Sequence, residues 1–376
     1  MIYDVNGNPI GSETTEDASS VFKTTEGVVA SNLANTSVKR PYWVFHLDCA
    51  RKYFSVANIK ILIDLMSANG LNQLQLHFSE NEGLRFGLDD MNIIDVDGNT
   101  YDLSTCLTTS NGGYLSQSDM DEIIVYSRSK HIDVVPSLDM PGHMNTILYK
   151  FPQFRYAGHN RTLDVKSDSA KKFAFAIIEK YARYFKSRGC IFYNIGADEV
   201  AGPIGRWSSI SSGDEHYFLE FVNEAANIVS RCGLIPRVFN DGVMYNRDRS
   251  VYFNKNMQVY CWSRVDGNTN LTTDELLSNG FELINANIGY YYIIPGSYGA
   301  YNKDLTVNSL LTALGTGTTT RSQSGFMFCV WCDSDDSAHA GDGGDGVIAD
   351  MRTIIPSLGT GIANSTATID YPILSD

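Results

Sequence analysis

The sequence has little positive charge and no long apolar run. Its 376 residues include 29 lysines and arginines against 43 aspartates and glutamates, for a formal net charge of -14. Nucleic acids and anionic membranes bind proteins through basic patches, so this balance argues against both partners. No stretch of about 18 apolar residues is present, and we therefore expect no membrane span.

The chain also lacks the patterns that identify metal and cofactor sites. Its seven cysteines are odd in number and fall mainly in apolar runs, which indicates small buried residues. The Cys329 to Cys332 pair has no second such pair and no histidine pair to complete a zinc site. No glycine-rich phosphate loop follows the first apolar run, Trp43 to Ala50. We expect neither a metal ion nor an organic cofactor.

The N-terminal region differs from the rest of the chain. Residues 1–38 are rich in Ser, Thr, Asn, Gly and acidic residues and show no sustained period, which predicts an arm or linker. An intact signal peptide has a basic segment followed by an apolar core, and these residues contain no such pattern. We expect an extracellular or cell-surface protein whose signal peptide has been removed, with residues 39–376 as one folded domain.

From Pro41 onward, apolar strand-like runs alternate with helical patterns. The predicted strands are 43–50, 73–79, 133–139, the run that begins at Cys190, 236–241, 258–263, 281–287 and 326–331. The predicted helices are 56–68, 119–130, 170–185, 215–230, 273–278 and 347–358. Eight strands that alternate with helices predict an α/β fold, a single (β/α)8 TIM barrel. The alternative, an open doubly wound sheet, normally has fewer strands and a phosphate-binding loop.

Two adjacent carboxylates, Asp198 and Glu199, follow the fourth predicted strand and its Gly196-Ala197 break. Successive side chains of a regular strand point to opposite faces, so the two acids share a cleft only where the strand ends. Neighbouring carboxyl groups compete for ionisation, which leaves one protonated and the other charged. Glycosidic cleavage requires such a donor and such a charged group. Taken alone, the pair also fits an acidic surface loop, which is very common.

Polar and aromatic residues recur at the ends of the predicted strands. In a barrel these ends meet at one face, where such residues are candidates for a site. Aromatic faces stack on sugar rings and charged groups bind hydroxyls, so the set indicates a sugar site. Taken singly, the two tryptophans also fit a core, and His77 fits a buried structural role. The set comprises Asp48, Arg51, His77, Glu80, Asp139, His143, Asp198, Glu199, Asp241, Trp262, Asn285, Asn287, Tyr290, Tyr291, Tyr292, Trp331 and Asp333.

Eight segments in order resemble the family 20 glycoside hydrolases, the β-N-acetylhexosaminidases. They are HLDCARKYFS, LQLHFSENEG, PSLDMPGHM, NIGADE, RVFNDG, YCWSRVDG, GFELINANIGYYYIIP and FCVWCD. The resemblance implies a retaining β-N-acetylglucosaminidase in which the acetamido oxygen of the sugar is the nucleophile and an oxazolinium intermediate forms. It implies a partner that is a GlcNAc-containing oligo- or polysaccharide, and we expect biofilm poly-β-1,6-GlcNAc as the substrate.

The same resemblance assigns roles around the acid pair. It implies that Glu199 is the general acid/base and that Asp198 orients and stabilises the acetamido group of the substrate. Tyr292 would hydrogen-bond the acetamido oxygen. His143 and Glu80 would form a supporting relay behind Glu199.

Five further residues are implied to contact the sugar itself. Arg51 would bind the O3 and O4 hydroxyls, and Asp333 would bind O4 or O6. Trp262, Trp331 and Phe239 would form an aromatic box around the ring.

Four residues depart from the usual family pattern. The family usually has His where Asn194 stands, Trp at Phe239, Asp at Glu80 and Glu at Asp333. The first three alter the surroundings of the acid pair or the shape of the box. Asp333 is one methylene shorter, which leaves room for a substituted sugar, as in the related lacto-N-biosidases. Arg51, in contrast, favours an unsubstituted terminal sugar.

Two other classes of protein remain open at the level of sequence. A metal-dependent barrel hydrolase would use His46, His77, His143 and nearby aspartates, whose ligand atoms must lie about 2 Å from one ion. A carbohydrate-binding protein without catalysis is compatible with the departures at Asn194 and Phe239.

Overall fold

The computed structural model describes residues 37–156, 159–200, 214–246, 249–262, 271–294, 324–333, 342–363 and 370–372. Residues 39–371 form one compact unit. A second unit combines 1–38 with 372–376 and is described only at 37–38 and at 372. The predicted arm therefore lies almost entirely outside the described residues, and its boundary stays a prediction.

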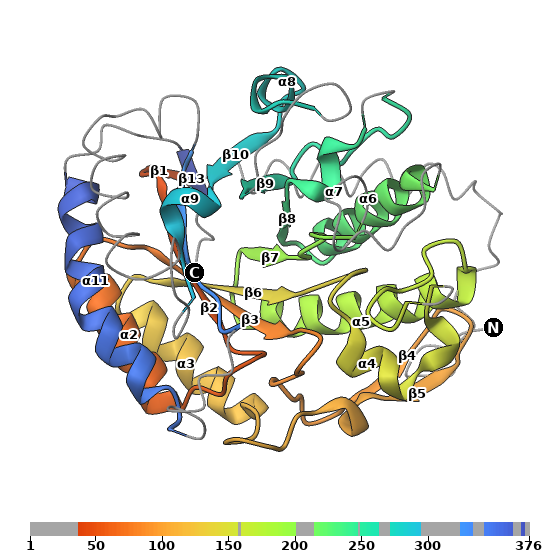
Figure 1. Cartoon of the computed structure of the whole chain (residues 1–376), viewed down its shortest axis with the longest axis horizontal. Helices are drawn as coiled ribbons and strands as arrows, with labels where there is room; N and C mark the ends of the chain where they lie inside the picture. Colours follow the sequence, from red (N-terminus) through yellow and green to blue (C-terminus); the bar gives the residue numbers. More distant parts are fainter. Residues whose placement is uncertain are drawn as a thin grey trace, which may run out of the picture. The chain divides into compact units, whose positions relative to one another are not determined.

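Eight parallel strands close into a barrel (Figure 1). The pairing of Asn285 with Phe326 joins the seventh strand to the eighth and completes the ring. Every predicted strand is present, and the predicted (β/α)8 barrel is confirmed. In order around the ring, the strands are β2 (Tyr42–Asp48), β3 (Gln73–Ser79), β6 (Asp133–Leu138), β7 (Phe192–Asn194), β8 (Ile235–Phe239), β9 (Gln258–Cys261), β10 (Glu282–Asn285) and β12 (Gly325–Val330).

Helices surround the barrel, and several of them begin at side-chain caps. At the start of α2, the Ser55 side chain accepts the N–H of Asn58. α5 turns one apolar stripe inward, with Phe173, Ile177 and Tyr181 all buried. Among the described residues, no helix is long and apolar enough to cross a membrane. The longer helices are α2 (Val56–Ala68), α3 (Gln117–Ser129), α5 (Asp168–Ser187), α6 (Glu215–Arg231) and α11 (Asp345–Ala363), and the shorter ones are α4 (Asn145–Lys150), α7 (Asp241–Met244), α8 (Thr273–Ser278) and α9 (Ile288–Tyr291).

Outside the barrel, the described residues also form a short hairpin and two 3₁₀ helices. The hairpin of β4 (Asn92–Ile94) and β5 (Thr100–Asp102) occupies the long insertion after β3. The sequence predicts turns there but no strands, because runs of three residues are too short to show an alternating pattern. The remaining elements are η1 (Leu103–Cys106), η2 (Pro152–Phe154) and the short strands β1 (Ser37–Lys39) and β13 (Asp370–Pro372).

The seventh barrel strand is interrupted, and the interruption places Tyr292. β10 ends at Asn285, and after α9 the short strand β11 (Tyr292–Ile293) resumes parallel pairing with β12. The β12 partners of Asn285 and Tyr292 are Phe326 and Cys329, which are much closer in sequence than Asn285 and Tyr292 are. The residues between β10 and β11 that have no partner in β12 leave the sheet and form α9. Tyr292 therefore returns to the barrel beside β12, near its C-terminal end.

Candidate active site

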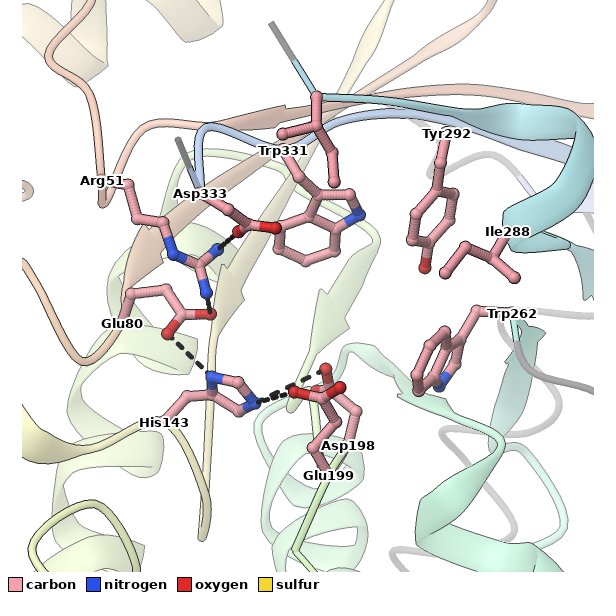
Figure 2. A pocket seen from close by; sticks show the side chains of 11 residues that line it. Arg51, Glu80, His143, Asp198, Glu199, Trp262, Ile288, Tyr292, Trp331 and Asp333 are labelled. Carbon is pink, nitrogen blue, oxygen red and sulfur yellow. Dashed lines mark hydrogen bonds and ion pairs between the residues drawn. The ribbon is translucent and has the colours of Figure 1, made fainter. Parts of the chain in front are cut away.

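The C-terminal ends of the barrel strands open on a cavity with charged and aromatic walls (Figure 2). The sequence predicts all of its lining residues except two isoleucines, which carry no chemical signal. Both lie in the segment GFELINANIGYYYIIP, which is one of the motifs that carry the family resemblance. The lining residues are Arg51, Glu80, His143, Asp198, Glu199, Trp262, Ile288, Tyr292, Ile294, Trp331 and Asp333.

Among the residues to which the family resemblance assigns a role, only Phe239 does not line this cavity. It is fully buried at the end of β8, and its ring centroid lies 6.1 Å from that of Trp331 and 5.8 Å from that of Tyr260. The expectation that Phe239 forms part of the cavity wall needs correction, because core packing holds its ring behind Trp331. Phe239 supports the aromatic wall from inside the barrel.

The acid pair lies on a loop with unusual backbone conformation. Gly196, Ala197 and Glu199 have φ angles of 82°, 69° and 54°. This left-handed conformation costs a residue other than glycine about 1–2 kcal/mol. At Gly196 a Cβ atom would also lie 1.9 Å from Oδ1 of Asp139. The turn brings Asp198 and Glu199 to the same cavity, as the sequence predicts (Figure 2).

Two buried carboxylates from flanking strands hold this loop. Oδ1 of Asp139, after β6, accepts the N–H of Ala197 at 3.0 Å. Oδ1 of Asp241, after β8, accepts the N–H of Glu199 at 3.3 Å. Each left-handed residue other than glycine in this loop therefore donates its backbone N–H to a carboxylate. The sequence places both aspartates at the barrel mouth but does not reveal this use.

His143 connects Glu199 to a buried carboxylate. Its Nε2 lies 3.3 Å from Oε2 of Glu199, and its Nδ1 hydrogen-bonds to Oε2 of Glu80 at 2.8 Å. Burial opposes the charge of Glu80, but His143 and the Arg51 guanidinium at 2.9 Å hold its pKa well below the usual value, so Nδ1 of His143 is the donor. Burial opposes charge on His143, but Glu80, Glu199 and Asp198 outweigh it and hold the pKa of His143 well above its usual value. The structure thus brings together the three residues of the predicted relay.

Asp198 lies deeper than Glu199 and close to a second aspartate. Oδ2 of Asp198 lies 3.9 Å from Nε2 of His143. Burial raises the pKa of Asp198, and the charge of His143 opposes that shift. Burial and the Asp198 carboxylate raise the pKa of Asp139 well above its usual range. The two aspartates therefore retain a proton at a pH at which an exposed pair would be fully ionised.

Possible metal ligands also gather in this region. In the described part of the chain, two groups of three residues have possible ligand atoms within 4.8 Å of one another. One is Asp139 with His143 and Asp198, and the other is His77 with Glu80 and Asp139. His46, which the metal hypothesis also invokes, belongs to neither group.

Arg51 forms ion pairs with four carboxylates at one edge of the cavity. Its guanidinium lies 2.9 Å from Asp48, Glu80 and Asp333 and 3.2 Å from Glu82. Burial raises the pKa of Asp333 to about 6, and the charge of Arg51 opposes the shift. Contact with several anions fixes the planar guanidinium in one orientation. The role of Glu82 in this cluster was not predicted.

Three aromatic side chains form another wall of the cavity (Figure 2). The rings of Trp262 and Tyr292 are nearly parallel, at 14° and 6.4 Å between centroids. Trp331 lies 6.1 Å from Tyr292 and packs at 4.1 Å on His46, inside the barrel. The indole N–H of Trp262 donates to Oδ2 of Asp241 at 2.5 Å. The predicted proximity of the tryptophans and Tyr292 is therefore present.

Sequence comparison finds the same family as the motifs. The model of "Glycosyl hydrolase family 20, catalytic domain" matches residues 41–336. A beta-hexosaminidase of Vibrio furnissii is 27% identical over 180 residues, which cover 43% of this chain and 29% of that protein. A lacto-N-biosidase of Bifidobacterium bifidum is 24% identical over 196 residues, which cover 48% and 17%. The matched part of the chain thus spans less than a third of the length of either relative.

Solved structures share the fold. A catalytic module of the pneumococcal exo-beta-D-N-acetylglucosaminidase StrH matches with a TM-score of 0.73 at 24% identity, over 86% of this chain and 83% of that one. Dispersin B matches with a TM-score of 0.65 at 20% identity, over 86% and 99%. At these identities the likeness shows the fold alone. Because the family model covers most of the barrel, the chain belongs to glycosyl hydrolase family 20.

Proposed function

We propose that this protein is a retaining β-N-acetylglucosaminidase that removes terminal β-linked GlcNAc by substrate-assisted catalysis. The observation that carries the proposal is the acid pair at the barrel mouth, with the Glu80 and His143 relay 3.3 Å behind Glu199. Membership of family 20 and relatives named beta-hexosaminidase support the same activity.

Glu199 is the proposed general acid and base. Its side chain is about one quarter exposed and faces the cavity, where a glycosidic oxygen can reach it. As the bond from the anomeric carbon to this oxygen breaks, the oxygen takes the proton of Glu199. The charge of His143 stabilises the carboxylate that is left behind. Glu80 in turn stabilises the positive charge of His143.

Asp198 and Tyr292 are proposed to act on the acetamido group. Its carbonyl oxygen attacks the anomeric carbon while the leaving group departs, which forms a positively charged oxazolinium ring. Asp198 accepts the acetamido N–H and stabilises the positive charge, and Tyr292 donates its hydroxyl to the acetamido oxygen. Water then attacks the anomeric carbon and gives a proton to Glu199, while the bond from that carbon to the acetamido oxygen breaks and the neutral acetamido group is restored. Two inversions at that carbon retain its configuration.

Arg51 and Asp333 are proposed to bind the hydroxyls of the terminal sugar. The guanidinium is fixed at the edge of the cavity by its carboxylate partners, which favours one unsubstituted ring over an extended chain. The charge of -14 favours a partly deacetylated, cationic polymer by attraction. We therefore propose poly-β-1,6-GlcNAc as the natural substrate, and an extracellular or cell-surface location where that polymer occurs.

A second candidate is release of a disaccharide, as the name lacto-N-biosidase of the Bifidobacterium relative describes. It is favoured by the short side chain of Asp333, which is 46% exposed at the cavity edge. The position of Arg51 beside Asp333 opposes it, because a substituted sugar would need the same space.

Three substrates separate these possibilities. We expect hydrolysis of p-nitrophenyl-β-GlcNAc and of a β-1,6-GlcNAc oligomer. Release only from the p-nitrophenyl glycoside of lacto-N-biose would replace the first candidate by the second. No release from any of the three, with sugar binding retained, would instead support a binding protein. Activity that is lost in chelator and restored by a divalent metal ion would support the metal-dependent class.

A further inference from the structure

Asp241 lies where the loop of the acid pair meets the aromatic wall. It follows β8, begins α7 and is fully buried. Its two carboxylate oxygens bind donors from two different elements. Oδ1 accepts the backbone N–H of Glu199 at 3.3 Å, and Oδ2 accepts the indole N–H of Trp262 at 2.5 Å. One carboxylate therefore joins the loop after β7 to the end of β9.

Both donors belong to groups whose position matters for the chemistry. Glu199 has a left-handed backbone with a φ of 54°, so an acceptor for its N–H helps to stabilise that conformation. The backbone N–H of Trp262 donates to Oδ1 of Asn240 at 3.1 Å. Adjacent residues thus hold Trp262 in two ways, since Asn240 binds its backbone and Asp241 binds its ring.

We propose that Asp241 is a positioning residue that couples the acid/base Glu199 to the sugar-facing ring of Trp262. It does not line the cavity, and it acts through its two neighbours. By binding both, it sets the separation between the proton donor and the aromatic surface beside the sugar. The inference rests on the proposed function, because that proposal supplies the roles of Glu199 and Trp262.

The coupling depends on the ionisation of Asp241. An ionised carboxylate accepts from both donors, whereas a protonated one uses an oxygen to carry its own hydrogen. Among the described residues, the titratable groups that face it are Asp198 and Glu199 from the loop, Tyr245 at the end of α7 and Tyr292 of β11. Burial, followed by the charge of Asp198, raises the pKa of Asp241 to about 7. The coupling is therefore strongest above neutral pH.

The Asp241→Asn variant tests the inference with little change of shape. Its amide oxygen still accepts the N–H of Glu199, but its amide N–H₂ group then faces the indole N–H of Trp262, donor against donor. We expect kcat/KM for p-nitrophenyl-β-GlcNAc to fall about 10- to 100-fold at pH 8, as for loss of a hydrogen bond to a charged group. The difference from the wild type should shrink at pH 5.5, where the wild-type carboxyl is itself largely protonated. A ratio of wild-type kcat/KM to variant kcat/KM that does not change with pH would contradict the proposal.

The Trp262→Phe variant and the double variant supply the matched comparison. Phenylalanine keeps an aromatic face but has no N–H for Asp241 to bind. If Asp241 acts through that N–H, the double variant should be no less active than Trp262→Phe alone. A loss equal to the product of the two single losses would overturn the coupling. If Asp241→Asn does not fold, Trp262→Phe carries the test. Its loss of kcat/KM relative to the wild type must also be larger at pH 8 than at pH 5.5.

Failure of the inference and failure of the proposed function give different results. An inactive wild-type protein would refute the proposed function itself. An active wild type, with an Asp241→Asn variant of equal kcat/KM at every pH, would refute only the role of Asp241.

Discussion

The burial of Asp241 has a cost in stability that can be measured. Its pKa is about 7 in the folded protein, against an ordinary value of 3.8. At about 1.36 kcal/mol for each unit, the difference corresponds to about 4 kcal/mol. Between these two values the folded state holds a proton that the unfolded state has lost. The stability of the wild type therefore falls as pH rises from about 4 to about 7, and this contribution is constant above that.

The Asp241→Asn substitution removes this contribution because an amide does not titrate. The free energy of unfolding of the variant, minus that of the wild type, should rise by up to about 4 kcal/mol from pH 4 to pH 8. Urea denaturation of both proteins at a series of pH values measures this difference. A difference that stays constant over the range would refute the reasoning, because it would mean that Asp241 titrates alike in the folded and unfolded states.

Three further substitutions test other parts of the site. Glu199→Gln should lower kcat about 10²- to 10⁴-fold with an unchanged melting temperature, and activity near that of the wild type would exclude Glu199 as the acid. Gly196→Ala should destabilise the fold by more than Gly98→Ala. The two glycines have φ angles of 82° and 83°, but a Cβ would meet Asp139 at 1.9 Å only in the first and nothing within 4 Å in the second. Equal melting temperatures for these two variants would show that the close contact is relieved. Arg51→Lys should raise KM at least about 10-fold, because a single ammonium group cannot reproduce the fixed guanidinium. An unchanged KM would remove Arg51 from sugar binding.

The barrel was predictable because each of its strands is a short apolar run followed by polar residues. Two features of the fold were not predictable. The hairpin of β4 and β5 has strands of only three residues. The interruption between β10 and β11 is the second, because the sequence predicts that the strand ends at residue 287 and does not show that pairing with β12 resumes at Tyr292.

The site was predictable where a residue reaches the cavity from the end of a strand, as Arg51 and Glu199 do. It was not predictable where a buried side chain binds the backbone. The carboxylates of Asp139 and Asp241 accept the N–H groups of Ala197 and Glu199, and only the structure shows which donors face them. The family resemblance implied that Phe239 contacts the sugar, and the sequence does not show that this ring is fully buried behind Trp331.

The acetamido group of the substrate is the central element of the proposed mechanism, and fluorination tests it most directly. The measurement is kcat for a series of p-nitrophenyl-β-glucosaminides whose N-acetyl group carries zero, one, two or three fluorines. Each fluorine withdraws electrons from the carbonyl oxygen and weakens it as a nucleophile. If that oxygen attacks the anomeric carbon, kcat should fall steeply with every fluorine added. Similar kcat values across the series would contradict substrate assistance and would indicate that a group of the enzyme, or water, attacks instead.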